Sequence, residues 1–227
     1  MPHSATAARR GSVRSPGTDV HPPRDRLWIH FVNTDAAAQG AGGDLLRDFD
    51  ALVAWLHDRG GVDDERAGGV LRRALLQPAA AAATLVEARR VRAALRALAE
   101  RGRTSEKVRD DAVAEINRVL GRSAGTRRLE PAPAGGFTRT FVPTGDAFAG
   151  LMIPIVESAA DSLLDAELPR VRRCADPRCH RVYLDATKNG LRRWCDMGTC
   201  GNRAKAARHR ARVAPTPTPT PAPLRRG

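Results

Sequence analysis

The residues of this chain whose type and spacing could do chemistry are its four cysteines. They are Cys174, Cys179, Cys195 and Cys200, and their spacing is C-x4-C-x15-C-x4-C. Each short-spaced pair places two thiols on one turn, and the interval between the pairs is long enough for the chain to bring the second pair back to the first. This spacing predicts one structural Zn²⁺ bound by four cysteines, which leaves no coordination position open for water or substrate.

Two disulfides, or four unrelated buried thiols, are the other interpretations of these cysteines. The first 25 residues carry arginines but no apolar segment of the kind found in secretory signals. We therefore expect a cytoplasmic protein, in which thiols stay reduced. A redox role is less favoured, because thioredoxin-type chemistry uses C-x-x-C and a zinc-bound thiolate is not free to react.

The segments around the cysteines predict the elements that position them. Residues 180–185 are expected to form a strand, Asn189 and Gly190 a tight turn in which both adopt positive φ, and residues 191–194 the return strand. The second cysteine pair leads directly into a helix-forming sequence, GNRAKAARHRARV. The expected order of knuckle, hairpin, knuckle and helix is typical of a treble-clef or zinc-ribbon finger. Because so short a module buries little core, the metal would supply most of its folding free energy.

The longer N-terminal part of the chain is expected to be mainly helical with a small antiparallel sheet, so the predicted fold class is mainly α (α+β). Asp44 is expected to cap the first long helix, and Pro154 to kink the last one. Apolar periodicity, caps and breakers predict a strand at 27–32, helices at 44–59, 63–76, 78–101 and from Ser105 onward, two strands within 127–142, and a helix at 145–168.

Composition divides the chain into four parts. Residues 1–25 are predicted to be a disordered tail, 26–168 the helical domain, 169–213 the finger, and 214–227 a Pro- and Thr-rich disordered tail. Because no run of about 18 apolar residues occurs, we expect no membrane span.

Positive charge is concentrated in the finger. Residues 169–213 contain 13 of the 38 Lys and Arg residues but only 3 of the 25 Asp and Glu residues, whereas residues 27–168 contain 18 and 20. Most of the formal net charge of +13 therefore belongs to one short segment. Clustered basicity of this kind is typical of modules that bind nucleic acid, and a solvated basic surface that maintains solubility is the alternative.

The finger segment resembles the CGNR zinc finger. The resemblance rests on CADPRC, on LDATKNGLRR and on WCDMGTCGNRAKAARHRAR, which includes the CGNR tetrapeptide at residues 200–203; Tyr183 stands where a phenylalanine is expected. In that family the finger follows a helical region called the ABATE domain, which residues 26–168 resemble through FVNT at 31–34, the helix around Trp55 and the overall length. The resemblance implies a bacterial, stress-responsive transcription regulator.

Three residues are expected to join the metal to the last helix. Cys200 starts this helix, whose exposed N–H groups and dipole would favour the thiolate. Gly201 would allow the backbone to approach the metal site closely, and Asn202 would cap the helix by accepting a backbone N–H.

Arg203 has two interpretations in the sequence. It either contacts phosphate or, as we prefer, pairs with Asp185 or Asp196 and holds the hairpin on the helix. Trp194 is expected to pack rather than to stack on a base. The residues with a predicted structural role in the finger are Asp185, Asn189, Gly190, Trp194, Gly201 and Asn202.

Basic residues on the helix and on the hairpin are expected to bind nucleic acid. They would contact phosphates on both sides of a major groove, with an affinity that falls steeply with salt. Specificity from one short finger would be low, so dimerisation or the N-terminal domain is expected to add to it. The expected contacts are Lys205, Arg208, Arg210 and Arg212 on the helix, where His209 adds to the charge, with Lys188, Arg192 and Arg193 on the hairpin and Arg203 at the joint.

The leading prediction is a DNA-binding transcriptional regulator at the nucleoid, whose N-terminal domain senses a small-molecule effector or forms a homodimer. RNA binding and protein interaction are the alternatives, although few aromatics other than Tyr183 and Trp194 are available to stack on single-stranded bases. An enzyme is not expected, because the sequence contains no Gly-rich phosphate loop, no H-E-x-x-H and no nucleophile elbow.

Overall fold

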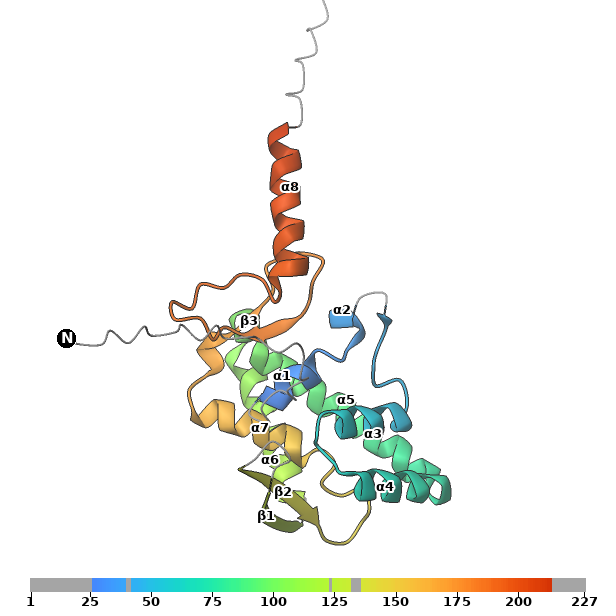
Figure 1. Cartoon of the computed structure of the whole chain (residues 1–227). Helices are drawn as coiled ribbons and strands as arrows, with labels where there is room; N and C mark the ends of the chain where they lie inside the picture. Colours follow the sequence, from blue (N-terminus) through green and yellow to red (C-terminus); the bar gives the residue numbers. More distant parts are fainter. Residues whose placement is uncertain (1–25, 40–41, 123, 132–135, 214–227) are drawn as a thin grey trace, which may run out of the picture.

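The computed structural model describes residues 26–39, 42–122, 124–131 and 136–213, so the predicted disordered tails at 1–25 and 214–227 lie outside the described residues. The predicted fold class, mainly helical with small antiparallel sheets, is confirmed. The helices are α1 (Leu27–Val32), α2 (Ala36–Gln39), α3 (Phe49–Asp58), α4 (Asp64–Leu76), α5 (Pro78–Ala99), α6 (Glu106–Arg122), α7 (Ile153–Leu164) and α8 (Asn202–Val213) (Figure 1). The strands and short turns are β1 (Gly125–Pro131), β2 (Phe137–Pro143), β3 (Val171–Arg173), β4 (Val182–Leu184), η3 (Arg101–Arg103), η4 (Leu168–Arg170) and η5 (Met197–Gly201).

Helix α1 occupies the segment 27–32, where the prediction of a strand is wrong. All of its residues except His30 are apolar and buried, so the segment shows no regular alternation of apolar and polar residues. A run this short does not reveal its period, and its burial on every side suits a helix as well as a strand. The helix packs against α7, where Trp28 Nε1 donates a hydrogen bond to Ser162 Oγ (2.9 Å).

Helix α3 is capped by Asp48, and the prediction that Asp44 caps it is wrong. The Asp48 carboxylate accepts a hydrogen bond from Ala51 N (2.7 Å). The Asp44 carboxylate instead pairs with the guanidinium of Arg92 on α5, with its Oδ1 2.7 Å from Arg92 Nη1. This hydrogen bond is the main reason that the pKa of Asp44 is lowered. Asp44 therefore ties the segment before α3 to the central helix.

Helices α4, α5 and α6 begin where the sequence predicts. Asp63 caps α4 by accepting a hydrogen bond from Arg66 N (2.8 Å). Pro78 lies in the first turn of α5, where its missing N–H has no intrahelical partner to lose. Helix α5 contacts α1, α3, α4 and α6 and so forms the centre of the body. Among the described residues, no helix has the length and apolarity that crossing a membrane requires.

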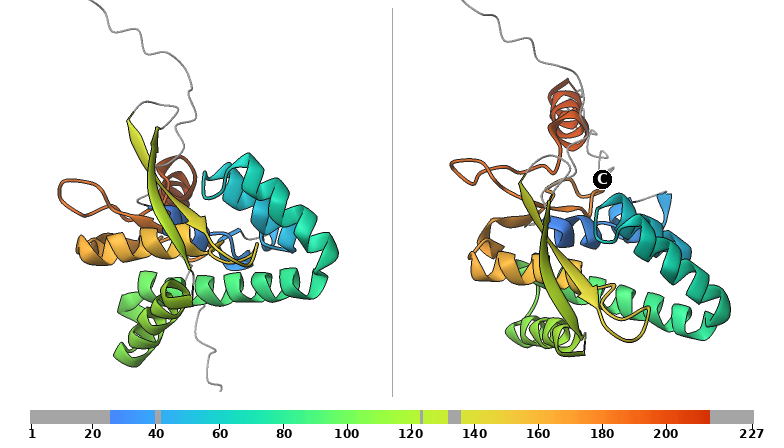
Figure 2. Two further views of the ribbon diagram at one scale, coloured as in Figure 1. Left: turned by 90° about the horizontal axis from the view of Figure 1, so that it is seen from below. Right: turned by 60° about the horizontal axis from the view of Figure 1, so that its bottom comes forward.

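Helix α7 starts at Ile153, later than the predicted 145, and the predicted kink at Pro154 is wrong. Pro154 lies in the first turn, where it breaks no helical hydrogen bond. The preceding residues form turns, such as the one in which Ile153 N donates to Gly150 O (3.1 Å). The two strands predicted within 127–142 are confirmed as the antiparallel ribbon β1–β2. The ribbon lies at the end of the molecule opposite α8 (Figures 1 and 2).

One hydrophobic core extends through the body and into the finger. Val171 of β3 and Val182 of β4 are buried in the same core as the helices of the body. The two strands of the finger are therefore covered by the body. The largest fully buried side chains of this core include Trp28, Phe31, Leu52, Leu56, Leu95 and Ile155.

Polar contacts also hold the finger on the body. Asn33, at the end of α1, bonds to the backbone of Val182 in both directions: its Nδ2 donates to the carbonyl (2.8 Å) and its Oδ1 accepts from the N–H (2.9 Å). The amide thus pairs with the free edge of β4 as a neighbouring strand would. Arg96 of α5 donates to the carbonyls of Val32 and His180, both at 3.0 Å. Helix α8 projects from the finger that is mounted in this way (Figure 1).

Candidate metal centre and nucleic-acid interface

The first cysteine pair lies at the turn between β3 and β4. The strands pair antiparallel, with Arg173 opposite Val182, and Cys174 N donates to Arg181 O across the turn (2.9 Å). A strand does form within 180–185, but it pairs with β3. The prediction of a return strand at 191–194 is wrong. Strand β3 has the sequence VRR, and so short a segment with two arginines shows no apolar alternation to predict it.

The loop that follows β4 is organised by a buried carboxylate. Asp185 is 0% exposed and accepts hydrogen bonds from the backbone N–H groups of Thr187 (3.0 Å) and Arg192 (2.9 Å). Its hydrogen bond with the Thr187 side chain is the chief cause of its lowered pKa. Gly190 adopts a positive φ of 62°, but Asn189 does not, so the predicted turn with two left-handed residues is wrong.

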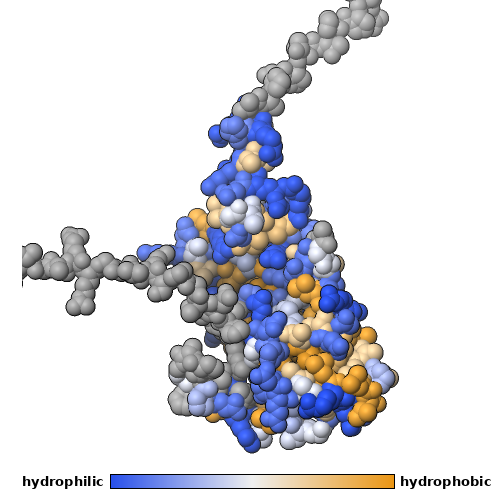
Figure 3. Space-filling view, turned by 45° about the vertical axis from the view of Figure 1, so that its right-hand side comes forward, coloured by the Kyte–Doolittle hydropathy of each residue, from blue (hydrophilic) through white to orange (hydrophobic). Residues whose placement is uncertain are grey.

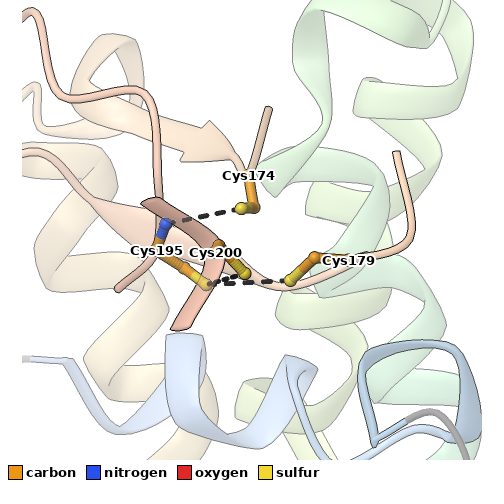
Figure 4. Close-up of side chains that lie close together, drawn as sticks. All are labelled: Cys174, Cys179, Cys195 and Cys200. Atoms are coloured by element: carbon orange, nitrogen blue, oxygen red, sulfur yellow. Dashed lines mark hydrogen bonds between the residues drawn. The ribbon is translucent and has the colours of Figure 1, made fainter. Parts of the chain in front are cut away.

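The four cysteine side chains converge on one point (Figure 4). Their Sγ atoms all lie within 4.8 Å of one another. Cys195 Sγ is 3.7 Å from Cys179 Sγ and 3.8 Å from Cys200 Sγ. Tetrahedral coordination with Zn–S bonds of about 2.3 Å places two sulfurs about 3.8 Å apart. The ligands therefore fit Zn²⁺ in number, chemical type and spacing.

Burial and mutual proximity govern the protonation of these thiols. Burial, followed by the neighbouring thiols, raises the pKa of Cys200 to about 11 and also raises the pKa of Cys195. Burial acts to raise the pKa of Cys174 too, but backbone N–H donors, led by Cys195 N (3.5 Å), outweigh it and lower this pKa. The sequence predicts that the thiolate form is favoured at Cys200. In the structure, the backbone N–H donors that favour a thiolate contact Cys174 instead. A divalent cation at the centre would favour all four thiolates together.

The cluster is the site of one structural Zn²⁺. Two ligands come from the turn between β3 and β4, and two come from the segment that leads into α8. Cys174 and Cys200 are buried, while Cys179 and Cys195 are half-buried. Four thiolates complete a tetrahedral shell, so the metal joins the sheet to the helix and offers no position for a substrate.

The turn η5 carries the last metal ligand into α8. Asp196 begins the turn and accepts hydrogen bonds from Thr199 N (2.7 Å) and Thr199 Oγ1 (2.8 Å). Asn202, the predicted cap, has helical backbone angles, and its Nδ2 donates to a carbonyl of η5 (3.0 Å). A Cβ at Gly201 would lie 2.7 Å from Met197 Sδ, so this glycine makes room for the Met197 side chain.

Arg203 pairs with Asp176, a residue that the sequence analysis did not single out. Arg203 Nη1 lies 2.7 Å from Asp176 Oδ2, and Asp176 Oδ1 accepts from Arg178 N (3.0 Å). Asp176 lies between Cys174 and Cys179, so the ion pair fastens the first turn of α8 to the first knuckle. The pairing expected for Arg203 was with Asp185 or Asp196, so the partner is a different aspartate. The signal that could have identified Asp176 is the Asp-Pro step between two cysteines, which is typical of a turn closed by a side chain.

Helix α8 presents most of its positive charge on one face. Lys205, Arg208, His209 and Arg212 follow the spacing i, i+3, i+4, i+7 and therefore share a face, whereas Arg210 lies on the other side. All five side chains are exposed. Within the described residues, no hydrogen bond or ion pair involves these side chains, and the helix contains no Asp or Glu. We call these five residues the cationic helix surface.

The basic residues near the loop after β4 differ in their contacts. The Arg192 guanidinium donates to backbone carbonyls, including that of Trp194 (2.8 Å), and lies 4.8 Å from the centre of the Tyr183 ring. Arg193 is exposed and lies 5.3 Å from the centre of the Trp194 ring. Lys188 is exposed in the loop. Lys188 and Arg193 are thus accessible, whereas Arg192 is engaged by the finger itself.

Two protein families match this chain. Residues 25–166 match the ABATE family, described as "Putative stress-induced transcription regulator". Residues 170–213 match the CGNR zinc finger, whose four cysteines form the cluster described above. Neither family is described as an enzyme. A search of curated proteins finds no match. Since the first match covers more than half of the chain, the protein belongs to the ABATE family, and it carries a CGNR zinc finger after the ABATE domain.

Proposed function

We propose that this protein regulates transcription in the cytoplasm by binding duplex DNA through its finger. The observation that carries the proposal is the cationic helix surface, whose side chains have no partner among the described residues. A cationic helix that lacks internal counter-charges is suited to phosphate. The ABATE domain, residues 26–168, would then hold the finger and regulate it.

The position of α8 supports contact with a DNA groove. The helix stands clear of the body along its length (Figure 1), and every residue from 205 to 212 is exposed. A major groove about 12 Å wide admits one α-helix with phosphates on both sides. Lys205, Arg208 and Arg212 would reach one backbone, and Arg210 would reach the other. Lys188 and Arg193 would extend the contact to phosphates beside the finger.

The aromatic residues of the finger favour duplex DNA over single-stranded RNA. Tyr183 is buried, and its hydroxyl donates to Arg192 O (2.6 Å). Trp194 is half-buried beside the cysteine cluster with Arg193 over its ring. Single-strand recognition depends on exposed rings that stack on bases, and neither ring is free for that role.

Replacing two residues of the cationic helix surface tests the proposal. For Arg208→Ala with Arg212→Ala, we expect the slope of log affinity against log salt to fall by about 2, because two phosphate contacts are lost. The measurement is a titration of labelled duplex DNA at several salt concentrations. The matched control is Arg73→Ala with Arg122→Ala, which removes two exposed charges from the ABATE domain. An unchanged slope in the first variant, or an equal loss in the control, would contradict the proposal.

A further inference from the structure

The hairpin of α4 and α5 exposes large apolar side chains. Leu75 and Leu76, at the end of α4, are 85% and 75% exposed. Figure 3 shows apolar residues gathered over the part of the molecule where Figure 1 places α4 and the adjoining end of α5. Scattered single leucines are common on protein surfaces, but protruding neighbours within an apolar patch mark an interaction surface.

A groove of about 740 Å³ lies beside these leucines, between α3, α4 and α5. Leu71, Ala74 and Leu75 line it from α4 because they are spaced i, i+3, i+4 and share a face. We define the apolar face as the groove wall together with the protruding leucines: Leu71, Ala74, Leu75, Leu76, Ala82 and Leu85.

The charges at the rim of the groove are balanced. The rim carries Arg47 and Arg72 together with Asp48 and Asp50. Arg47 and Asp48 pair with each other at 3.5 Å. Arg72 and Asp50 are exposed, and no ion pair joins either of them to another residue in the described part of the chain. A rim with equal numbers of both charges does not select a polyanion such as DNA, but it complements a surface with the same composition.

We propose that the apolar face binds the same face of a second copy of this chain, which forms a two-fold symmetric homodimer. A protruding pair of leucines and an apolar groove lie side by side on one face, so two copies related by a two-fold axis can each insert the leucines into the groove of the other. In the proposed arrangement, Arg72 of one copy lies opposite the partner's Asp50, which gives both charges a partner. This arrangement does not depend on DNA binding and leaves both α8 helices free.

The mass of the full chain in solution tests the proposal. We expect wild-type protein at micromolar concentrations to have twice the chain mass of 24.5 kDa in light scattering after size exclusion. Leu75→Glu with Leu76→Glu should return the mass to that of one chain. Both side chains are exposed, so this variant should keep the melting temperature that the wild type has when it is diluted to the monomer.

The matched control is Leu164→Glu, which places a charge at an 83% exposed leucine outside the apolar face. It should remain dimeric. A monomeric wild type, a dimeric Leu75→Glu with Leu76→Glu variant, or a monomeric control would overturn the proposal. If the wild type is monomeric and binds a fluorescent apolar dye that the double variant does not bind, the apolar face belongs to a small apolar ligand instead.

A charge exchange tests the two-fold arrangement itself. Asp50→Arg and Arg72→Asp should each weaken the dimer at least tenfold, because like charges then meet at two symmetric positions. The variant with both changes should recover dimerisation, since opposite charges meet again. Failure of the double exchange to recover it would overturn the two-fold arrangement. DNA affinity of the finger is measured separately, so loss of the dimer and loss of DNA binding are distinguishable.

Discussion

The three aspartates of the finger fold its turns. Asp176, Asp185 and Asp196 each accept a hydrogen bond from a backbone N–H two or three residues further along the chain. Hydrogen bonding lowers the pKa of all three, so they remain ionised while they organise the turns. These are the only acidic residues between 169 and 213. Within the described part of the finger, Asp176 and Asp185 pair with Arg172, Arg178 and Arg203, so the cationic helix surface is left without a counter-charge.

At the residue scale, the pair Asp176–Arg203 should be coupled energetically. Asp176 is 5% exposed and Arg203 is 40% exposed on their side chains. A double-mutant cycle with Asp176→Ala and Arg203→Ala, followed by denaturant unfolding of the zinc-loaded protein, should give a coupling of about 1 kcal/mol. The value lies below that of a fully buried pair because Arg203 is partly solvated. The control cycle pairs Asp176→Ala with Arg193→Ala and should show additive effects.

Helix α8 depends on the elements before it. Its 12 residues are at the lower limit of what an isolated helix needs for stability in water, and among the described elements η5 is the one that packs closely against it. The turn η5 supplies a first turn that is already fixed by Cys200 and by the hydrogen bonds of Asp196. We therefore expect the metal to nucleate the helix that carries the cationic helix surface.

Removal of the metal should melt α8. Purified protein is expected to contain about one zinc per chain. Chelation should abolish hydrogen-exchange protection in α8 and in the turn between β3 and β4, and readdition of zinc should restore it. Cys200→Ser should show the same loss without chelator. Lys188→Ala, an exposed change in the same finger, is the control and should retain protection and zinc. Persistent protection of α8 in metal-free protein would contradict nucleation by zinc.

The elements differ in how far the sequence could predict them. Helices α4 and α5 are set by local signals, the cap at Asp63 and the proline at residue 78, which act within one turn. The cysteines could be identified as metal ligands because zinc coordination depends on spacing. The helix at 27–32 and the short strand β3 could not be predicted from the sequence, because their conformations depend on tertiary burial. The partner of Arg203 depends on the path of the chain around the metal, which local pattern does not contain.

In the whole molecule, the finger and the ABATE domain form one packed structure. Val171 and Val182 lie in the core of the body, and the amide of Asn33 pairs with the edge of β4. Arg96 adds hydrogen bonds from α5 to both parts. The direction of α8 relative to the body is therefore fixed by several contacts rather than by a flexible linker.

Asn33→Ala should loosen this attachment while the zinc site remains. The variant loses two hydrogen bonds to Val182 and leaves its backbone groups without a partner, so we expect a loss of about 1–3 kcal/mol in the free energy of unfolding. Hydrogen exchange should rise at Val182, while the zinc content stays unchanged. Asn117→Ala, which removes an exposed side-chain amide from α6, is the control. Unaltered exchange at Val182 would contradict the role assigned to Asn33.

The shared core has a consequence for the supply of metal in the cell. A ligand that binds only the folded state adds its binding free energy to the stability of everything that unfolds with its site. Because Val171 and Val182 join the strands beside the zinc to the body, the metal stabilises the ABATE domain as well as the finger. Zinc starvation would then lower the amount of intact protein and not only its DNA affinity, since chains that unfold more often are degraded faster.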